Sequence, residues 1–198
     1  KKYYDIAYKH LKTATKYVIR DDNSTYHTFY FDPETGAPVK GVTHQGFSDT
    51  SCWSRGQAWG VYGVPLGYAY TKDEALVQSF KNLADYFLEH LPEDYIPYWD
   101  LIFTSGDEPR DSSAAAIAIC GILEAEKFLD DNDEKKNIYH NAAMQMLKSL
   151  IENYTSEGVE SNGILLHAVY GKPQNNGVDE CNIWGDYYYM EALVRLMK

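Results

Sequence analysis

The residues best suited to chemistry lie between positions 27 and 59 of the sequence. They are His27, Gln45, Trp53, Arg55 and Trp59. A histidine exchanges a proton near neutral pH, an amide orients a hydroxyl or a water, and a guanidinium offers a fork of donors to a carboxylate. Indole rings add flat apolar faces suited to ring-shaped ligands. Each residue alone is more often a packed or surface side chain, so it is their clustering that favours a small-molecule site.

Arg55 and Trp59 stand at the start of a helix that the pattern predicts from 54 to 71. Beyond Arg55 this stretch carries no charge until Lys72, and a helix that is apolar on every side is buried on every side. Apolar walls with a few convergent polar groups at one end are typical of a ligand site. The alternative interpretation is a core helix in which Arg55 is a structural ion-pair partner.

The helices that must position these residues alternate in character along the chain. Segments 1–19, 72–91 and 134–154 have apolar residues on one face, whereas the helices beginning near Ser54 and Asp111 are apolar all round. An outer ring of helices exposes one face, and an inner ring is covered on its outside. The alternation therefore predicts an all-α fold, an α/α barrel or an arc of one, with a last helix from Trp184 to the end.

Short β-rich stretches interrupt the helices at two places. Segments 26–31 and 39–43 flank a Pro-Glu-Thr-Gly turn and predict a small β-hairpin. Residues 156–182 are expected to be a loop with a single strand-like piece at 164–169.

In such a barrel the loops that lead into the inner helices gather at one end, which we call the mouth. Arg55, Asp111 and Trp184 each stand at the start of an inner helix, so the pattern predicts that they converge there. Asp111 is the obvious carboxylate, either as a general acid or, more often for this position, as a helix N-cap. Asp186 and the Asp179–Glu180 pair are weaker candidates, and no convincing pair of catalytic carboxylates emerges.

Composition excludes several classes of function. The chain has 198 residues, enough for one domain, and a net charge of −11 without a basic patch, which argues against nucleic acid. No apolar run is long enough to span a membrane. Phosphate loops, serine nucleophile elbows and zinc-binding spacings are missing from the sequence. Cys52, Cys120 and Cys181 show neither metal-ligand spacing nor a disulfide framework.

Five motifs in order resemble the unsaturated glucuronyl hydrolases, glycoside hydrolase family 88; they lie at 26–30, 43–46, 53–59, 109–116 and 184–193. The resemblance implies an α/α barrel of six hairpins. It also implies a substrate, an oligosaccharide released by a polysaccharide lyase and ending in a Δ4,5-unsaturated uronic acid. In this family an aspartate protonates the vinyl ether, water adds at the other carbon, and the hemiketal collapses. The resemblance implies no metal and no organic cofactor.

Carried over by motif, the resemblance assigns substrate-binding residues along the chain. The residues expected to line the sugar site are His27, Gln45, Trp53, Arg55 and Trp59, with Tyr170 and Lys172 expected to touch the substrate or a sulfate. The two aspartates essential to the family lie before the matched segment, so no catalytic residue is assigned here. Residues 1–198 are accordingly expected to be the C-terminal half of one barrel domain, and to bind without turnover.

Three other interpretations stay open. The first is a related hydrolase acting on unsaturated rhamnogalacturonan, the second a non-catalytic helical sugar-binding module, and the third a structural helical domain. The expected partner is a small oligosaccharide, with neither nucleic acid nor membrane. A degrader of imported disaccharides is expected in the cytoplasm, with the periplasm as the alternative, and the sequence leaves the oligomeric state open.

Overall fold

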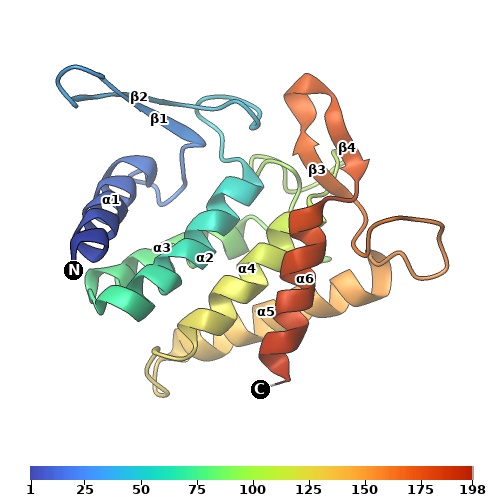
Figure 1. Ribbon diagram of the computed structural model, residues 1–198. Coiled ribbons are helices and arrows are strands. Elements are labelled where there is room, and N and C mark those ends of the chain that lie inside the picture. Colours follow the sequence, from blue (N-terminus) through green and yellow to red (C-terminus); the bar gives the residue numbers. More distant parts are fainter. Residues whose placement is uncertain (198) are drawn as a thin grey trace.

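The computed structural model describes residues 1–197, whose helices form a two-layered arc (Figure 1). The inner layer contains α2 (Ser54–Thr71), α4 (Ser112–Ala125) and α6 (Ile183–Leu196). On the outside, α3 (Ala75–Glu89) packs against α2, and α5 (Glu134–Asn153) packs against α4. At one end of the arc, α1 (Lys2–Val18) lies beside α2. The predicted all-α alternation of inner and outer helices is confirmed.

Helix α4 is the centre of the core. Every residue from Ser112 to Ala125 is buried, because α2 and α6 flank the helix and α5 covers its outside. Small residues make this possible, and Gly121 is the tightest point. A Cβ atom at Gly121 would lie 2.5 Å from the carbonyl oxygen of Val61 in α2. Glycine is therefore required where the backbones of α2 and α4 approach each other.

Two β-hairpins lie in the loops. The first pairs β1 (Thr28–Phe31) with β2 (Pro38–Val42) in antiparallel register, which confirms the predicted hairpin. The second pairs β3 (Ala168–Gly171) with β4 (Asn176–Glu180) around a short 3₁₀ turn, η1 (Lys172–Gln174). The prediction of a lone strand at 164–169 is wrong. The segment β4 contains a glycine and two acids, so its sequence carries no strand pattern, and it is held by pairing with β3.

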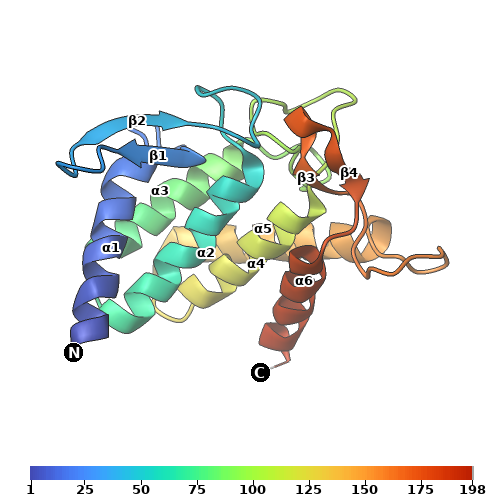
Figure 2. The ribbon, with the colours of Figure 1, turned by 45° about the horizontal axis from the view of Figure 1, so that its top comes forward.

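The connections between helices are long where the inner helices begin and short where they end. Segments 19–53, 90–111 and 154–182 lead into α2, α4 and α6, and all three lie at the end where these helices begin (Figure 2). Segments 72–74 and 126–133 are the short turns at the other end, the floor. Lys72 ends α2 in the left-handed conformation, with φ of 57°, and its N–H bonds to the carbonyl of Tyr68. The predicted gathering of loops at one mouth is confirmed.

Helix α1 differs from its prediction. Its one-sided pattern predicted a buried face, yet no residue of α1 is fully buried: on that face Tyr4 is 45% exposed, whereas Leu11 is half-buried and packs against the core. An apolar cavity of about 470 Å³ separates α1 from α2, with Leu11 on one side and Gly60 and Gly63 on the other. Within residues 1–197 no further helix fills this space, and so the apolar side of α1 is only half-buried.

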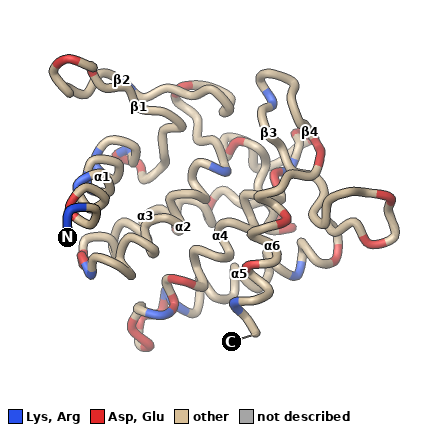
Figure 3. Tube along the Cα trace, in the orientation of Figure 1, with Lys and Arg blue, Asp and Glu red and all other residues tan. Residues whose placement is uncertain are grey.

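Charged residues are sparse on the two most buried inner helices, α2 and α4. Figure 3 shows them on α1, in the turns and in the loops, whereas the middle parts of α2 and α4 carry none. Arg55 is the one charged residue of α2, and it lies in the first turn at the mouth. None of the helices in residues 1–197 is both long and apolar enough to cross a membrane.

Candidate functional site

Arg55 lies at the centre of the mouth and is almost completely buried, with its side chain 3% exposed. Its Nη1 donates to Asp111 Oδ2 at 2.7 Å, to Ser113 Oγ at 3.2 Å and to the carbonyl of Val169, and its Nη2 donates to the carbonyl of Tyr170 at 2.9 Å. These partners come from α4 and β3. Arg55 thus joins three elements that are far apart in the sequence, as the prediction of convergence requires.

Two indole rings lie against the Arg55 guanidinium. Its central carbon lies 4.6 Å from the ring centre of Trp53 and 5.3 Å from that of Trp184, distances at which a cation is attracted to the face of an indole. Trp184, at the start of α6, was predicted to lie at the mouth but was not assigned to the sugar site. Its indole N–H is buried without an acceptor in residues 1–197, which leaves a donor beside the cluster.

His27 and Gln45 form the second part of the cluster. His27 Nε2 lies 3.0 Å from Gln45 Oε1, and its ring contacts the indole of Trp53 edge to face at 4.8 Å. Burial lowers the pKa of His27, the hydrogen bond to Gln45 opposes this shift, and the charge of Arg55 lowers the pKa further. His27 is therefore neutral at neutral pH, and its two ring nitrogens serve as one donor and one acceptor, Nε2 toward Gln45 and Nδ1 toward Thr28 Oγ1 at 2.7 Å.

The β3–β4 hairpin closes the cluster from the other side. The Tyr170 carbonyl accepts a hydrogen bond from Gln45 Nε2 at 2.5 Å as well as the one from Arg55. Tyr170 is 46% exposed, and the centre of its ring lies 5.8 Å from that of Trp184. Lys172 follows in η1 and is half-buried. The structure thus brings Tyr170 to the predicted cluster through its backbone, and places Lys172 two residues further along the same hairpin.

Trp59 lies one turn below Arg55 on α2. Its ring contacts Tyr188 of α6 at 5.2 Å, and Tyr62 contacts the same tyrosine at 5.0 Å. These rings come from α2 and α6 and meet across α4 below the mouth. They form an aromatic wall that continues the site toward the floor.

The candidate acids at the mouth have structural partners. Asp111 occupies the N-cap position of α4, but its side chain makes no capping bond and instead pairs with Arg55 and accepts a hydrogen bond from Ser113. The predicted role of its side chain as a cap is wrong, because the buried guanidinium is the stronger partner. Asp186 accepts from the backbone N–H groups of Ile164 and Leu165, and Asp179 bonds to His167.

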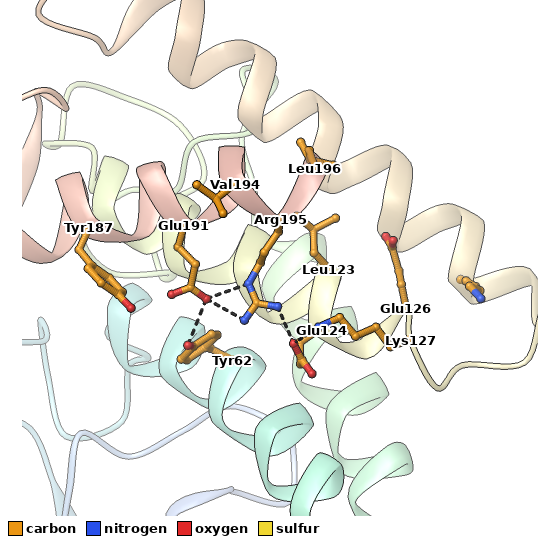
Figure 4. A pocket seen from close by; sticks show the side chains of 11 residues that line it. Tyr62, Leu123, Glu124, Glu126, Lys127, Tyr187, Glu191, Val194, Arg195 and Leu196 are labelled. Carbon is orange, nitrogen blue, oxygen red and sulfur yellow. Dashed lines mark hydrogen bonds and ion pairs between the residues drawn. The ribbon is translucent and has the colours of Figure 1, made fainter. Parts of the chain in front are cut away.

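A polar cavity of about 830 Å³ lies toward the floor (Figure 4). Arg195 donates to Glu191 at 2.7 and 2.8 Å and also to Glu124, while the hydroxyl of Tyr62 donates to Glu191 at 3.2 Å. Burial raises the pKa of Glu124, but hydrogen bonds from Lys127 and Arg195 outweigh it and leave the pKa below its ordinary value. A carboxylate held ionised in this way is a poor proton donor. The mouth is the better candidate site because it gathers imidazole, amide and indole groups around one point.

The chemistry available at the mouth is recognition of a polar ring. The hydroxyl and carboxyl groups of such a ligand can bond to amide, imidazole and indole groups of the protein. The faces of the tryptophan rings can pack against the ligand's ring. No group of three or more histidine, cysteine or acidic side chains within residues 1–197 is arranged to hold a metal ion.

The comparisons with known proteins place this arrangement among the α/α-barrel glycoside hydrolases. The profile of Glycosyl Hydrolase Family 88 matches residues 1–197, and the chain belongs to this family. It is 57% identical over its whole length to an unsaturated chondroitin disaccharide hydrolase of Streptococcus pneumoniae (strain ATCC BAA-255 / R6). It is 41% identical, over 98% of its length, to an unsaturated glucuronyl hydrolase of Bacillus sp. (strain GL1).

Solved structures agree with the sequence comparisons. The chain is similar to the unsaturated glucuronyl hydrolase of Streptococcus agalactiae, with a TM-score of 0.96, 54% identity and coverage of the whole chain but 50% of that structure. A mutant of that enzyme has been solved in complex with dGlcA-GalNAc6S, and it matches the chain with a TM-score of 0.91 and covers it completely, over 53% of its own length. The chain spans about half the length of the curated relatives it matches, 50% of the S. pneumoniae protein and 52% of the Bacillus protein.

Proposed function

We propose that this chain supplies the sugar-binding half of an unsaturated glucuronyl hydrolase. The substrate is a lyase-generated oligosaccharide, of the glycosaminoglycan disaccharide type, that ends in a Δ4,5-unsaturated uronic acid. The observation that carries the proposal is the cluster of His27, Gln45, Trp53 and Arg55 at one mouth of the arc. The names of the relatives at 57% and 41% identity support the same substrate class.

The reaction adds water across the vinyl ether of the unsaturated sugar. A carboxylic acid delivers a proton to one carbon of the double bond, water adds at the other, and the hemiketal opens and releases the remaining sugar. In this reaction Gln45 and neutral His27 orient hydroxyl groups, and Trp53 and Trp59 contact the sugar ring. Residues 1–198 form the C-terminal half of the barrel domain in this proposal, with the acid contributed from outside them, so the chain by itself binds substrate but does not hydrate it.

Binding and turnover of unsaturated disaccharides test the proposal. We expect saturable binding of an unsaturated chondroitin disaccharide by calorimetry or ligand-observed NMR, with Gln45→Ala weakening it. The ultraviolet absorbance of the vinyl ether should stay constant, and its loss with this chain alone would contradict the proposed division of roles. Equal affinity for saturated disaccharides would favour a sugar-binding module. Preference for a pectin-derived disaccharide would favour a rhamnogalacturonyl hydrolase.

A further inference from the structure

The β3–β4 hairpin is attached to the rest of the mouth by hydrogen bonds to its backbone. Arg55 donates to the carbonyls of Val169 and Tyr170, and Gln45 donates to the same Tyr170 carbonyl. These oxygens lie within β3, immediately before η1, which carries Lys172. The two site residues therefore fix where the Tyr170 ring and the Lys172 ammonium stand relative to a ligand.

The Arg55 guanidinium is itself held from α4. Asp111 is fully buried and accepts from Nη1 at 2.7 Å, and Ser113 Oγ donates to the other oxygen of the same carboxylate at 2.5 Å. A buried cation needs a charged partner, and a planar guanidinium with several acceptors in fixed positions has one orientation. The direction in which Arg55 presents its donors to β3 is thus set by Asp111.

We propose that Asp111 is a positioning residue, which holds the Arg55 guanidinium against the carbonyls of Val169 and Tyr170 and so sets the place of the β3–β4 hairpin at the sugar site. The part of this inference that concerns the ligand rests on the function proposed above. Both terminal nitrogens of Arg55 serve protein oxygens, so Arg55 acts through the hairpin and through its contact with the two indoles. Specificity for the part of the sugar that meets the hairpin then depends on a residue that the ligand does not touch.

Hydrogen exchange without ligand tests the attachment itself. Asp111→Asn keeps the shape of the side chain but removes its charge, and Arg55→Lys keeps the charge but loses the fork that spans two carbonyls. In both variants we expect the amides of residues 168–180 to exchange roughly tenfold to a hundredfold faster, as the loss of a charged buried hydrogen bond implies. Unchanged exchange in this segment would overturn the proposal.

Asp100→Asn is the matched control. Asp100 is as buried as Asp111, but it accepts from the backbone of Phe47 and Ile102 and from the hydroxyl of Ser51. Its substitution should speed exchange mainly in residues 46–54 and affect the hairpin less than Asp111→Asn does, because Asp100 reaches the hairpin only through the neighbouring Gln45. Hairpin exchange as fast in this control as in Asp111→Asn would mean general loosening of the mouth and would count against a specific role of Asp111. If Asp111→Asn does not fold, Ser113→Ala, which removes the hydroxyl that supports the carboxylate, replaces it.

Affinity for an unsaturated chondroitin disaccharide separates positioning from a purely structural role. If Asp111 acts through the hairpin, Asp111→Asn and Tyr170→Ala each weaken binding, and the double variant is no weaker than the worse of the two. Losses that multiply would show that Asp111 supports the fold independently of Tyr170, and would refute the proposal. If the unmodified chain does not bind the disaccharide at all, the proposed function fails, whereas the exchange experiment still decides the attachment.

Discussion

Gly121→Ala should destabilise the protein by forcing apart the two helices that hold the site. The added Cβ would lie 2.5 Å from the Val61 carbonyl oxygen and 2.7 Å from the Tyr62 Cα, against an ordinary contact of 3.4 Å or more. Helices α2 and α4 must then separate by about 1 Å. Overpacking of this kind costs about 1–3 kcal/mol, and a backbone obstacle places it at the upper end.

The gain in helix propensity opposes this cost. Alanine is better than glycine in a helix by about 1 kcal/mol, so we expect a net loss of about 2 kcal/mol and a melting temperature lower by roughly 4–8 °C. Gly63→Ala in α2 is the control, because a Cβ there meets no atom within 4 Å. It should gain about 0.5–1 kcal/mol from propensity alone.

Urea unfolding measures the change in the free energy of unfolding for both variants, provided that their m values equal that of the unmodified chain. The two identical substitutions, in neighbouring helices, should therefore change the stability with opposite signs. If Gly121→Ala is as stable as the unmodified chain, the close approach of α2 and α4 does not constrain position 121. If both variants are destabilised equally, the packing of α2 against α4 does not distinguish the two glycines.

Three further outcomes follow from the described contacts. Burial lowers the pKa of His27, so stability should fall as pH decreases through the imidazole range of the unfolded chain, and His27→Gln should flatten this dependence in urea titrations at several pH values. Arg195→Met leaves Glu191 without its cation and Glu124 with Lys127 alone, and should cost about 2–4 kcal/mol, with the pKa of Glu124 rising in an NMR titration. Iodoacetamide at pH 8 should label one thiol, because Cys181 is exposed whereas burial raises the pKa of Cys52 to about 12; labelling of all three in the native state would contradict the burial.

The helices were predictable because their patterns are local. The uncharged run after Asp111 predicts a helix buried on all sides, and all fourteen residues of α4 are buried. The one-sided pattern of α1 predicted a buried face that is only half-buried, since a periodicity states which face can be buried but not how completely a neighbour covers it.

The sequence predicted which residues lie at the candidate site, but not the hydrogen bonds between them. Arg55 and Asp111 are 56 positions apart, and nothing local indicates that the carboxylate serves Arg55 instead of capping its own helix. The second hairpin escaped prediction because its anchors are the backbone oxygens of Val169 and Tyr170. Every residue carries such an oxygen, so no side-chain pattern distinguishes these two.

The unequal connections bear on how such a chain diversifies. The turns at the floor, 72–74 and 126–133, are short and set the packing of consecutive helices, whereas 19–53, 90–111 and 154–182 carry the two hairpins and most of the mouth. Changes in the long segments alter what the mouth contacts and leave the helical arc intact, because loops tolerate substitution and insertion better than the elements they join. The segments that contact a ligand and the turns that set helix packing thus lie at opposite ends of the same helices. Substitutions in one group can accumulate during evolution with little effect on the other.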